Sequence, residues 1–251
     1  MFDLTLINTN ARSLCPKVNS LITCFEELEA SLAVITETWL SDGPSLAEDL
    51  EDLKLGAGLG MLTKNRPANP QGYSHGGIAL VYHESAASFH EVKLRNVSDL
   101  EVLVATGKFQ GLAKPVFVVA CYVPPGYTAA RGTACLEHIR DSVVELKRRY
   151  SVPHVVISGD FNQWPIQDYL IDFNDLKEID VGPSRGDRKI DRTFVNFAEQ
   201  ITASGVLPPL EPDTPDLGAP SDHKVTYISG AIPRVRPYKC CLLYTSPSPR
   251  D

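Results

Sequence analysis

The sequence predicts an α/β protein in which two β-sheets pack face to face and helices cover their outer sides. Three observations lead to this fold class. Many short apolar segments have strand-like patterning, few segments have helical spacing, and the two kinds alternate along the chain. A chain of 251 residues with 43% hydrophobic residues can bury a large core, and chains of this size often fold as one unit.

The first half of the chain is expected to contain several strands and one helix. Residues 3–8 alternate between apolar and polar side chains, as in a strand, whereas residues 17–31 carry apolar residues at helical spacing. Residues 32–35 are apolar, and residues 32–36 predict a buried strand. A stretch rich in turn residues, with Pro44, Gly56, Gly58 and Gly60, follows. Further strands are then expected near residues 60–64, 77–82, 88–94 and 101–106.

The second half continues the same alternation. Residues 116–123 predict a strongly apolar strand that ends at Pro124 and Pro125. Residues 133–150 have the spacing of an amphipathic helix. The remaining strands are expected at residues 154–158, 190–195 and 224–229, with loops rich in Pro, Asp and Gly between residues 205 and 222.

The last residues differ from the rest of the chain. Residues 241–251 show no periodicity, and their sequence matches the translation of a common sequencing adapter. We therefore interpret residues 240–251 as adapter read-through that does not belong to the fold. Residues 1–239 would then form one domain, with the natural chain interrupted near Tyr238.

The charge distribution bears on the class of partner. The formal net charge is −7, and nine Asp or Glu residues but no Lys or Arg lie between Glu26 and Asp52. This balance argues against tight nonspecific binding of DNA but leaves room for a local basic edge. Basic residues gather in two places: Lys147, Arg148 and Arg149, and Arg185, Arg188, Lys189 and Arg192.

Targeting features point to a soluble protein of the nucleus or cytoplasm, without a membrane partner. The first residues lack the basic and apolar regions of a signal peptide, and no apolar run approaches the roughly 18–20 residues of a membrane span. Six cysteines at irregular spacing, without a CxxC pair, favour reduced thiols over a disulfide framework or a zinc site.

Polar residues cluster where the predicted strands end, which is where loops present side chains over a rigid scaffold. Each such residue alone is typical of a turn, a cap or a core position; together they indicate chemistry. These positions are Asn8-Thr9-Asn10, Thr36-Glu37-Thr38, Tyr122, Gly159-Asp160-Phe161-Asn162, Asp191, and Ser221-Asp222-His223.

Hydrolysis of a phosphodiester would use this set. Glu37, with Asp222, offers oxygen ligands for Mg²⁺, which offsets charge on the phosphate. His223 is suited to activate water near neutral pH, and Asp191 could fix its tautomer if adjacent strands bring the two together.

The remaining residues complete the reaction. Asn10, Asn162 and Tyr122 are neutral donors for the phosphate oxygens, and Asp160 could manage the proton of water or of the leaving group. Arg185, Arg188 and Ser221 are candidate substrate contacts.

The ordered set N…E…Y…GDFN…D…SDH resembles the endonuclease/exonuclease/phosphatase superfamily, which includes apurinic endonucleases and pancreatic deoxyribonuclease. The resemblance extends from about residue 3 to residue 230. Within this superfamily, three segments look like the endonucleases of non-LTR, LINE-like retrotransposons. They are Asn10-Ala11-Arg12-Ser13-Leu14, Thr36-Glu37-Thr38-Trp39-Leu40, and Pro183-Ser184-Arg185-Gly186 with Ile190-Asp191.

The resemblance implies a four-layer α/β sandwich of the deoxyribonuclease-I type. It also implies Mg²⁺, or Mn²⁺, at Glu37, the dyad of Asp191 and His223, and Asp222 near the metal or the imidazole. Asn10, Asn162 and Tyr122 would contact phosphate, and Asp160 would act in proton transfer.

The resemblance further implies a function. Such an endonuclease would nick target DNA and leave a 3′-hydroxyl, from which a reverse transcriptase domain further along the intact polyprotein would prime. Alternatives are an apurinic-site repair endonuclease, another phosphodiesterase of the superfamily, or a decayed, non-catalytic nucleic-acid-binding relic.

Overall fold

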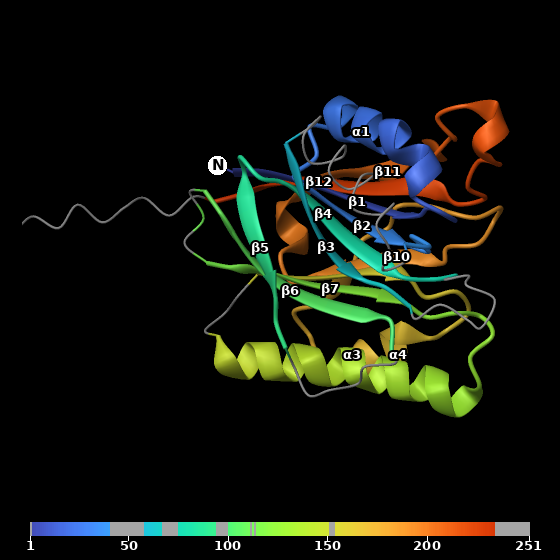
Figure 1. Ribbon diagram of the computed structural model, residues 1–251. Coiled ribbons are helices and arrows are strands. Elements are labelled where there is room, and N and C mark those ends of the chain that lie inside the picture. Colours follow the sequence, from blue (N-terminus) through green and yellow to red (C-terminus); the bar gives the residue numbers. More distant parts are fainter. Residues whose placement is uncertain are drawn as a thin grey trace, which may run out of the picture.

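The computed structural model describes residues 2–40, 58–66, 75–93, 100–110, 112, 114–150 and 154–233. These residues form four layers, a helix, two β-sheets and a second layer of helices (Figure 1). The predicted α/β sandwich of two packed mixed sheets with outer helices is confirmed. Residues 240–251, interpreted above as adapter read-through, lie outside the described residues.

Each sheet has six strands. The first sheet has the order β11-β12-β1-β2-β4-β3, built from Ile201–Pro209, Lys224–Ile232, Phe2–Asn10, Leu32–Thr36, Ile78–His83 and Leu59–Lys64. The second sheet has the order β5-β6-β7-β8-β10-β9, built from Ala87–Glu91, Val102–Phe109, Val116–Tyr122, His154–Asp160, Asp191–Val195 and Lys177–Glu178.

One parallel pair of neighbouring strands lies near the centre of each sheet. In the first sheet β1 runs parallel to β2, with Asn10 beside Thr36. In the second sheet β7 runs parallel to β8, with Tyr122 beside Asp160. All four strands end at one side of the sandwich, which we call the carboxyl edge.

Apolar side chains fill the space between the sheets. Leu6 and Val34 of the first sheet and Val118 and Val156 of the second belong to one buried cluster. Strand β7 is buried along its whole length, because helices cover its other face. This explains why its sequence is apolar throughout instead of alternating.

Helices cover both outer faces, α1 on the first sheet and α3 with α4 on the second (Figure 1). Helix α1 (Val18–Glu27) buries Leu21 and Phe25 against the first sheet. Helix α3 (Ala129–Arg149) begins at Thr128, whose hydroxyl accepts a hydrogen bond from the Arg131 amide. Helix α4 spans Ile166–Leu170, and 3₁₀ turns span Cys15–Lys17, Ala198–Gln200 and Pro215–Leu217.

Some expected element boundaries were wrong. Residues 205–209, expected to be loop, belong to β11, which forms the edge of its sheet beside β12 alone. An edge strand tolerates Pro208 and Gly205 because one of its sides needs no ladder hydrogen bonds. Helix α1 ends at Glu27, several residues before the expected end, and Glu29 then has a positive φ of 48°. The sequence pattern did not predict α4 or β9.

Two further expectations concern thiols and membranes. Cys121 and Cys135 are buried free thiols, as expected. In the described part of the chain, no helix combines the length and apolar character that membrane crossing requires.

Gly159 provides a test of the contact between β7 and β8. Its φ is +153°, and a Cβ there would lie 1.8 Å from the Cys121 carbonyl oxygen. We expect Gly159→Ala to lower the free energy of unfolding by about 3 kcal/mol or more, through strain and overpacking. Chemical denaturation measures this loss.

Gly182→Ala is the matched control, because Gly182 also has a positive φ (+88°) but open space around its Cα. It should cost only about 1–2 kcal/mol, the backbone penalty alone. Equal losses for the two variants would show that the close approach of β7 and β8 does not limit the size of the side chain.

Candidate active site

Six of the predicted polar residues lie together at the carboxyl edge. They come from the ends of strands in both sheets and from the loops beside them. They are Asn10, Glu37, Tyr122, Asp160, Asp191 and His223.

Glu37 lies between neutral donors. Its Oε1 accepts hydrogen bonds from the Tyr122 hydroxyl at 2.6 Å and from Asn10 Nδ2 at 2.9 Å. Asn10 Nδ2 also lies 3.0 Å from Asp160 Oδ2, so the amide joins the carboxylates of the two sheets. Neither neutral donor balances the charge of Glu37, which leaves that carboxylate suited to a cation.

Asp191 and His223 form a buried pair. His223 Nδ1 lies 2.7 Å from Asp191 Oδ2, and the exposed fractions of the two residues are 2% and 0%. Because a carboxylate can only accept, this contact places the imidazole proton on Nδ1. Nε2 then has a lone pair and faces Asp160, whose Oδ2 lies 4.0 Å away. Such an imidazole can accept a proton from water.

Adjacent strands were expected to bring this pair together, and that expectation was wrong. Asp191 begins β10 in the second sheet, whereas His223 directly precedes β12 in the first. The contact therefore crosses the sandwich and depends on how the two sheets pack.

The electrostatics of the cluster favour proton transfer near neutral pH. Burial, and then the negative charge of Asp191, raise the pKa of Asp160 to about 7. Burial lowers the pKa of His223, but its hydrogen bond to Asp191 and the nearby carboxylates raise it overall. Burial and the neighbouring Glu37 raise the pKa of Tyr122, which keeps its phenol protonated.

Two serines hold the pair in place. Ser184 Oγ accepts a hydrogen bond from the Asp191 amide at 3.1 Å. Ser221 Oγ donates to the Asn10 carbonyl at 2.6 Å and accepts from the His223 amide at 3.1 Å. Ser221, expected to contact substrate, is thus buried beneath the site. The sequence pattern did not show that Ser184 supports Asp191. The amide that Ser184 binds lies several residues later in the chain, beyond a turn.

Asn162 adjoins the cluster through its backbone. Its amide donates to Asp160 Oδ1 at 2.8 Å, and its side-chain Nδ2 donates to the Val123 carbonyl at 3.1 Å. Its φ of 49° is one of six positive values among the described non-glycine residues.

The loops next to the cluster are strained where they pass the site. Arg12, Ser13, Glu37 and Trp39 also have positive φ angles. Such conformations cost on the order of 1–3 kcal/mol each and persist only where the surroundings hold them. Lys17, which the sequence pattern did not single out, stabilises the strained conformation of Arg12 and Ser13. Its Nζ donates to the carbonyls of Arg12 at 2.9 Å and of Ser13 at 3.2 Å.

Asp222 lies at the mouth of the cluster among basic residues. Its carboxylate pairs with Arg12 at 3.3 Å and with Arg185. Its Oδ1 lies 4.0 Å from His223 Nε2. Arg188 is exposed and contacts Arg185 through a backbone bridge, so it lies beside this group without joining the cluster.

Within the part of the chain that the structure describes, two arrangements near the cluster could hold a divalent cation. Asp160, Asp191 and His223 offer ligand atoms within 4.8 Å of one another, but they include an imidazole already bonded to a carboxylate. Glu37 offers a carboxylate whose Oε1 accepts from two neutral donors of the described residues, Asn10 and Tyr122. Because Mg²⁺ prefers oxygen ligands, the donor set at Glu37 fits it better.

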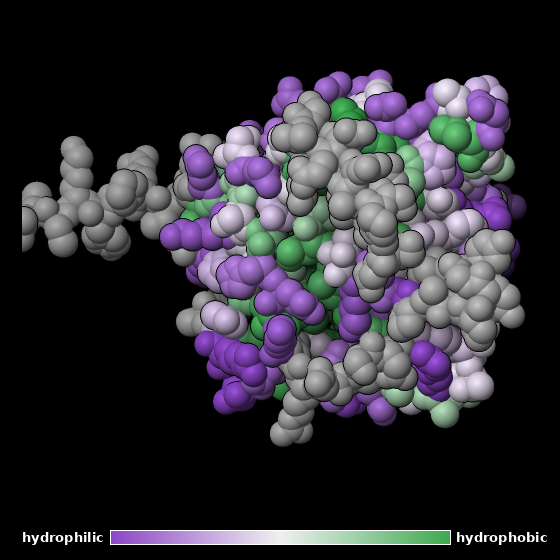
Figure 2. Space-filling model, viewed as in Figure 1, coloured by the Kyte–Doolittle hydropathy of each residue, from purple (hydrophilic) through white to green (hydrophobic). Residues whose placement is uncertain are grey.

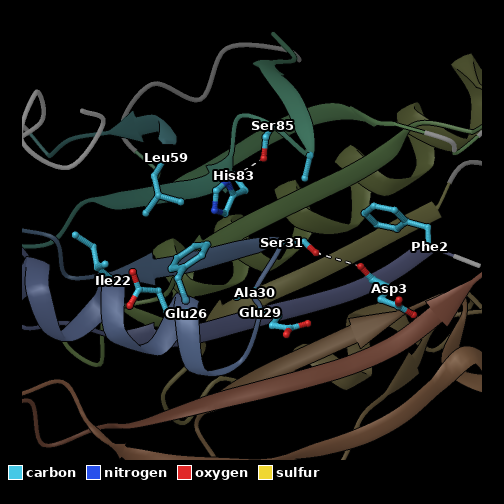
Figure 3. Close-up of a pocket in the computed structure, with 12 residues that line it drawn as sticks. Phe2, Asp3, Ile22, Glu26, Glu29, Ala30, Ser31, Leu59, His83 and Ser85 are labelled. Atoms are coloured by element: carbon cyan, nitrogen blue, oxygen red, sulfur yellow. Dashed lines mark hydrogen bonds between the residues drawn. The ribbon is translucent and has the colours of Figure 1, made fainter. Parts of the chain in front are cut away.

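A cavity of about 480 Å³ lies elsewhere, at the opposite end of β1 and β2 (Figure 3). Its lining includes Phe2, Asp3, Ser31 and His83 and the last turn of α1. In Figure 2, apolar residues are visible near the middle of the face shown, with hydrophilic residues on one side of them. The lining of the cavity includes no residue of the polar cluster.

The model of the Endonuclease/Exonuclease/phosphatase family matches residues 6–223. A search of the curated proteins finds no match.

Solved structures share the fold at low sequence identity. The endonuclease domain of TRAS1, a telomere-specific non-LTR retrotransposon, is 14% identical, with a TM-score of 0.62; 91% of this chain and 98% of that domain are covered. An AP endonuclease from Archaeoglobus fulgidus is 13% identical over 91% of this chain and all of that one, with a TM-score of 0.61. D. rerio TDP2 complexed with a single-strand DNA product is 13% identical over 92% of this chain and 100% of that one, with a TM-score of 0.62.

The contacts of Lys17 predict a stability effect. Lys17→Met keeps the length of the side chain but removes the donor to two backbone carbonyls. We expect the free energy of unfolding to fall by about 1–3 kcal/mol. Denaturation of this variant beside Lys108→Met, a change at an exposed position on β6, measures the effect. Equal stability of the two variants would show that the Arg12–Ser13 turn does not depend on Lys17.

Proposed function

Because the chain belongs to the endonuclease/exonuclease/phosphatase family, we propose that it is a divalent-metal-dependent endonuclease that nicks DNA and leaves a 3′-hydroxyl. One observation carries this proposal. A buried imidazole–carboxylate pair faces a carboxyl group whose pKa is about 7, within one polar cluster that also holds Glu37.

The proposed reaction uses both titratable groups. His223 Nε2 takes a proton from water, whose oxygen attacks phosphorus while the bond from phosphorus to the 3′-oxygen breaks. Asp160 in its protonated form gives its proton to the departing 3′-oxygen. Asp191 stabilises the imidazolium that forms. The products are a 3′-hydroxyl and a 5′-phosphate.

Other residues bind and orient. Glu37, with Asp222, would hold Mg²⁺ or Mn²⁺, which when bound neutralises charge on the phosphate. Asn10 and Tyr122 donate to the Glu37 carboxylate in this structure. In the proposed reaction they would exchange these hydrogen bonds for phosphate oxygens, to which Asn162 also donates.

The biological role in this proposal is that of a retrotransposon endonuclease, acting on DNA in the nucleus or cytoplasm. Support comes from the Asn10–Leu14 and Thr36–Leu40 segments and from the shared fold of the TRAS1 domain. The nicked 3′-hydroxyl would prime a reverse transcriptase domain of the same polyprotein.

Repair of apurinic sites is the second candidate, since an AP endonuclease shares the fold. Intact supercoiled plasmid and an abasic duplex, offered in parallel with Mg²⁺, separate the two functions. Preferred nicking of intact DNA supports the retrotransposon role, and cleavage restricted to the abasic duplex supports repair. Mapping the end groups of the product tests the 3′-hydroxyl. Absence of any cleavage would favour a non-catalytic relic.

Glu37→Gln should abolish nicking in Mg²⁺ while the melting temperature stays near that of the native protein. The amide oxygen can still accept hydrogen bonds from Asn10 and Tyr122, but the negative charge is lost. Plasmid nicking and thermal denaturation measure the two effects. Activity close to that of the native protein would remove Glu37 from the proposed metal site.

The paired role of Asp191 and His223 predicts non-additive kinetics. His223→Ala should lower turnover by about two to four orders of magnitude. Asp191→Asn should also be damaging, because an amide that donates toward Nδ1 favours the wrong tautomer. The double variant should be little worse than His223→Ala alone. Losses that add independently would contradict the proposed dyad.

A further inference from the structure

Two arginines converge on one carboxylate beside the proposed catalytic imidazole. Arg12, from the turn after β1, and Arg185, from the loop before β10, both pair with Asp222. Their side chains are 48% and 38% exposed, and that of Asp222 is 33% exposed. Solvent, and therefore a ligand, can reach all three groups, which together carry a net charge of +1.

The backbone holds Arg12 in this position. Arg12 and Ser13 have φ angles of 44° and 80°, and the Arg12 amide donates to Asn10 Oδ1 at 3.1 Å. The buried Lys17 ammonium binds both of their carbonyls. An ordinary surface ion pair contributes little and needs no such support. Strain of this kind gathers where a side chain must be preorganised for a ligand.

The chemistry of the group indicates which ligand. A guanidinium fork matches the oxygens of a carboxylate and of a phosphate equally well. Asp222 pairs with both guanidinium groups, as an ionised carboxylate does. Asp222 thus presents to the arginines the same kind of anionic oxygens as a phosphodiester.

We propose that Arg12 and Arg185 form a binding site for a backbone phosphate of nucleic acid, and that Asp222 occupies this site until DNA displaces it. The proposal rests on the proposed function, because it assigns the phosphate to the DNA substrate. It adds Arg12 to the residues that contact substrate and gives Asp222 a competing role before DNA binds.

The proposed phosphate site lies next to the catalytic imidazole. Asp222 Oδ1 lies 4.0 Å from His223 Nε2, so a phosphate oxygen at this place would lie beside the imidazole. Displacement also releases the Asp222 carboxylate near the cluster, where the proposed function needs a second oxygen ligand. DNA binding would therefore complete the site that cleaves it.

DNA affinity measured without turnover tests the proposal. Fluorescence anisotropy of a labelled duplex in EDTA, repeated over a series of salt concentrations, gives the affinity and its salt dependence. Arg12→Ala and Arg185→Ala should each weaken binding by about 5- to 50-fold at low salt, as expected for the loss of one charge-assisted contact. Each should also reduce the slope of log affinity against log salt by about 1.

Asp222→Asn tests whether Asp222 competes with DNA for the two arginines or only holds them in position for DNA. Removal of the competing charge should tighten DNA binding by a factor of about 2–10, with the melting temperature used to check the fold. Arg148→Ala, on α3 at the opposite end of β8, is the matched control and should leave affinity unchanged. Weaker binding by Asp222→Asn, or arginine variants that behave like Arg148→Ala, would overturn the proposal.

Inorganic phosphate separates this inference from the proposed function. Nuclear magnetic resonance of the Arg12 and Arg185 Nε–H groups should show saturable shifts on titration with phosphate. In Arg12→Lys, which loses one guanidinium fork, the shift of the remaining Arg185 Nε–H group should be smaller at the same phosphate concentration. Phosphate binding without DNA binding would support the subsite and contradict the DNA function. DNA binding that neither arginine variant weakens would contradict the subsite and support the DNA function.

Discussion

Packing of the two sheets against each other is the constraint on which the site depends. Strands β1 and β2 in one sheet and β7 and β8 in the other are buried along nearly all their length. Each parallel pair must be covered on both faces, by the other sheet and by helices. Once the apolar faces meet, the ends of all four strands lie at the carboxyl edge, and Asn10, Tyr122 and Asp160 approach one another.

The same packing makes the cluster electrostatically unusual. Asp160, Asp191 and His223 are almost completely buried, and unpaired charges in such surroundings are strongly unfavourable. The cluster reduces this cost through hydrogen bonds from Asn10, Asn162 and His223, and through a pKa of Asp160 raised toward neutrality. Groups arranged in this way are characteristic of sites that transfer protons.

The charged residues at the mouth of the site are exposed, unlike those of the buried cluster. Here Arg12, Asp222 and Arg185 remain accessible to solvent, and their attraction is screened. Strained turns, one of them bound by Lys17, fix where these groups lie. The ion pairs at the mouth could therefore break and re-form when a ligand binds, while the buried cluster keeps its arrangement.

The sequence by itself determined the fold class, most strands and the identity of the clustered residues, because strand periodicity and short motifs such as Gly159–Asn162 are local properties. It did not predict β11, whose edge position tolerates Pro208, or the short α4. The tertiary structure alone decided which distant residues meet. His223 meets Asp191 across two sheets, Lys17 binds the Arg12–Ser13 turn, and Asp222 lies between two arginines. The physical reason is that local spacing fixes the direction of a side chain along its strand, whereas sheet packing fixes its neighbours.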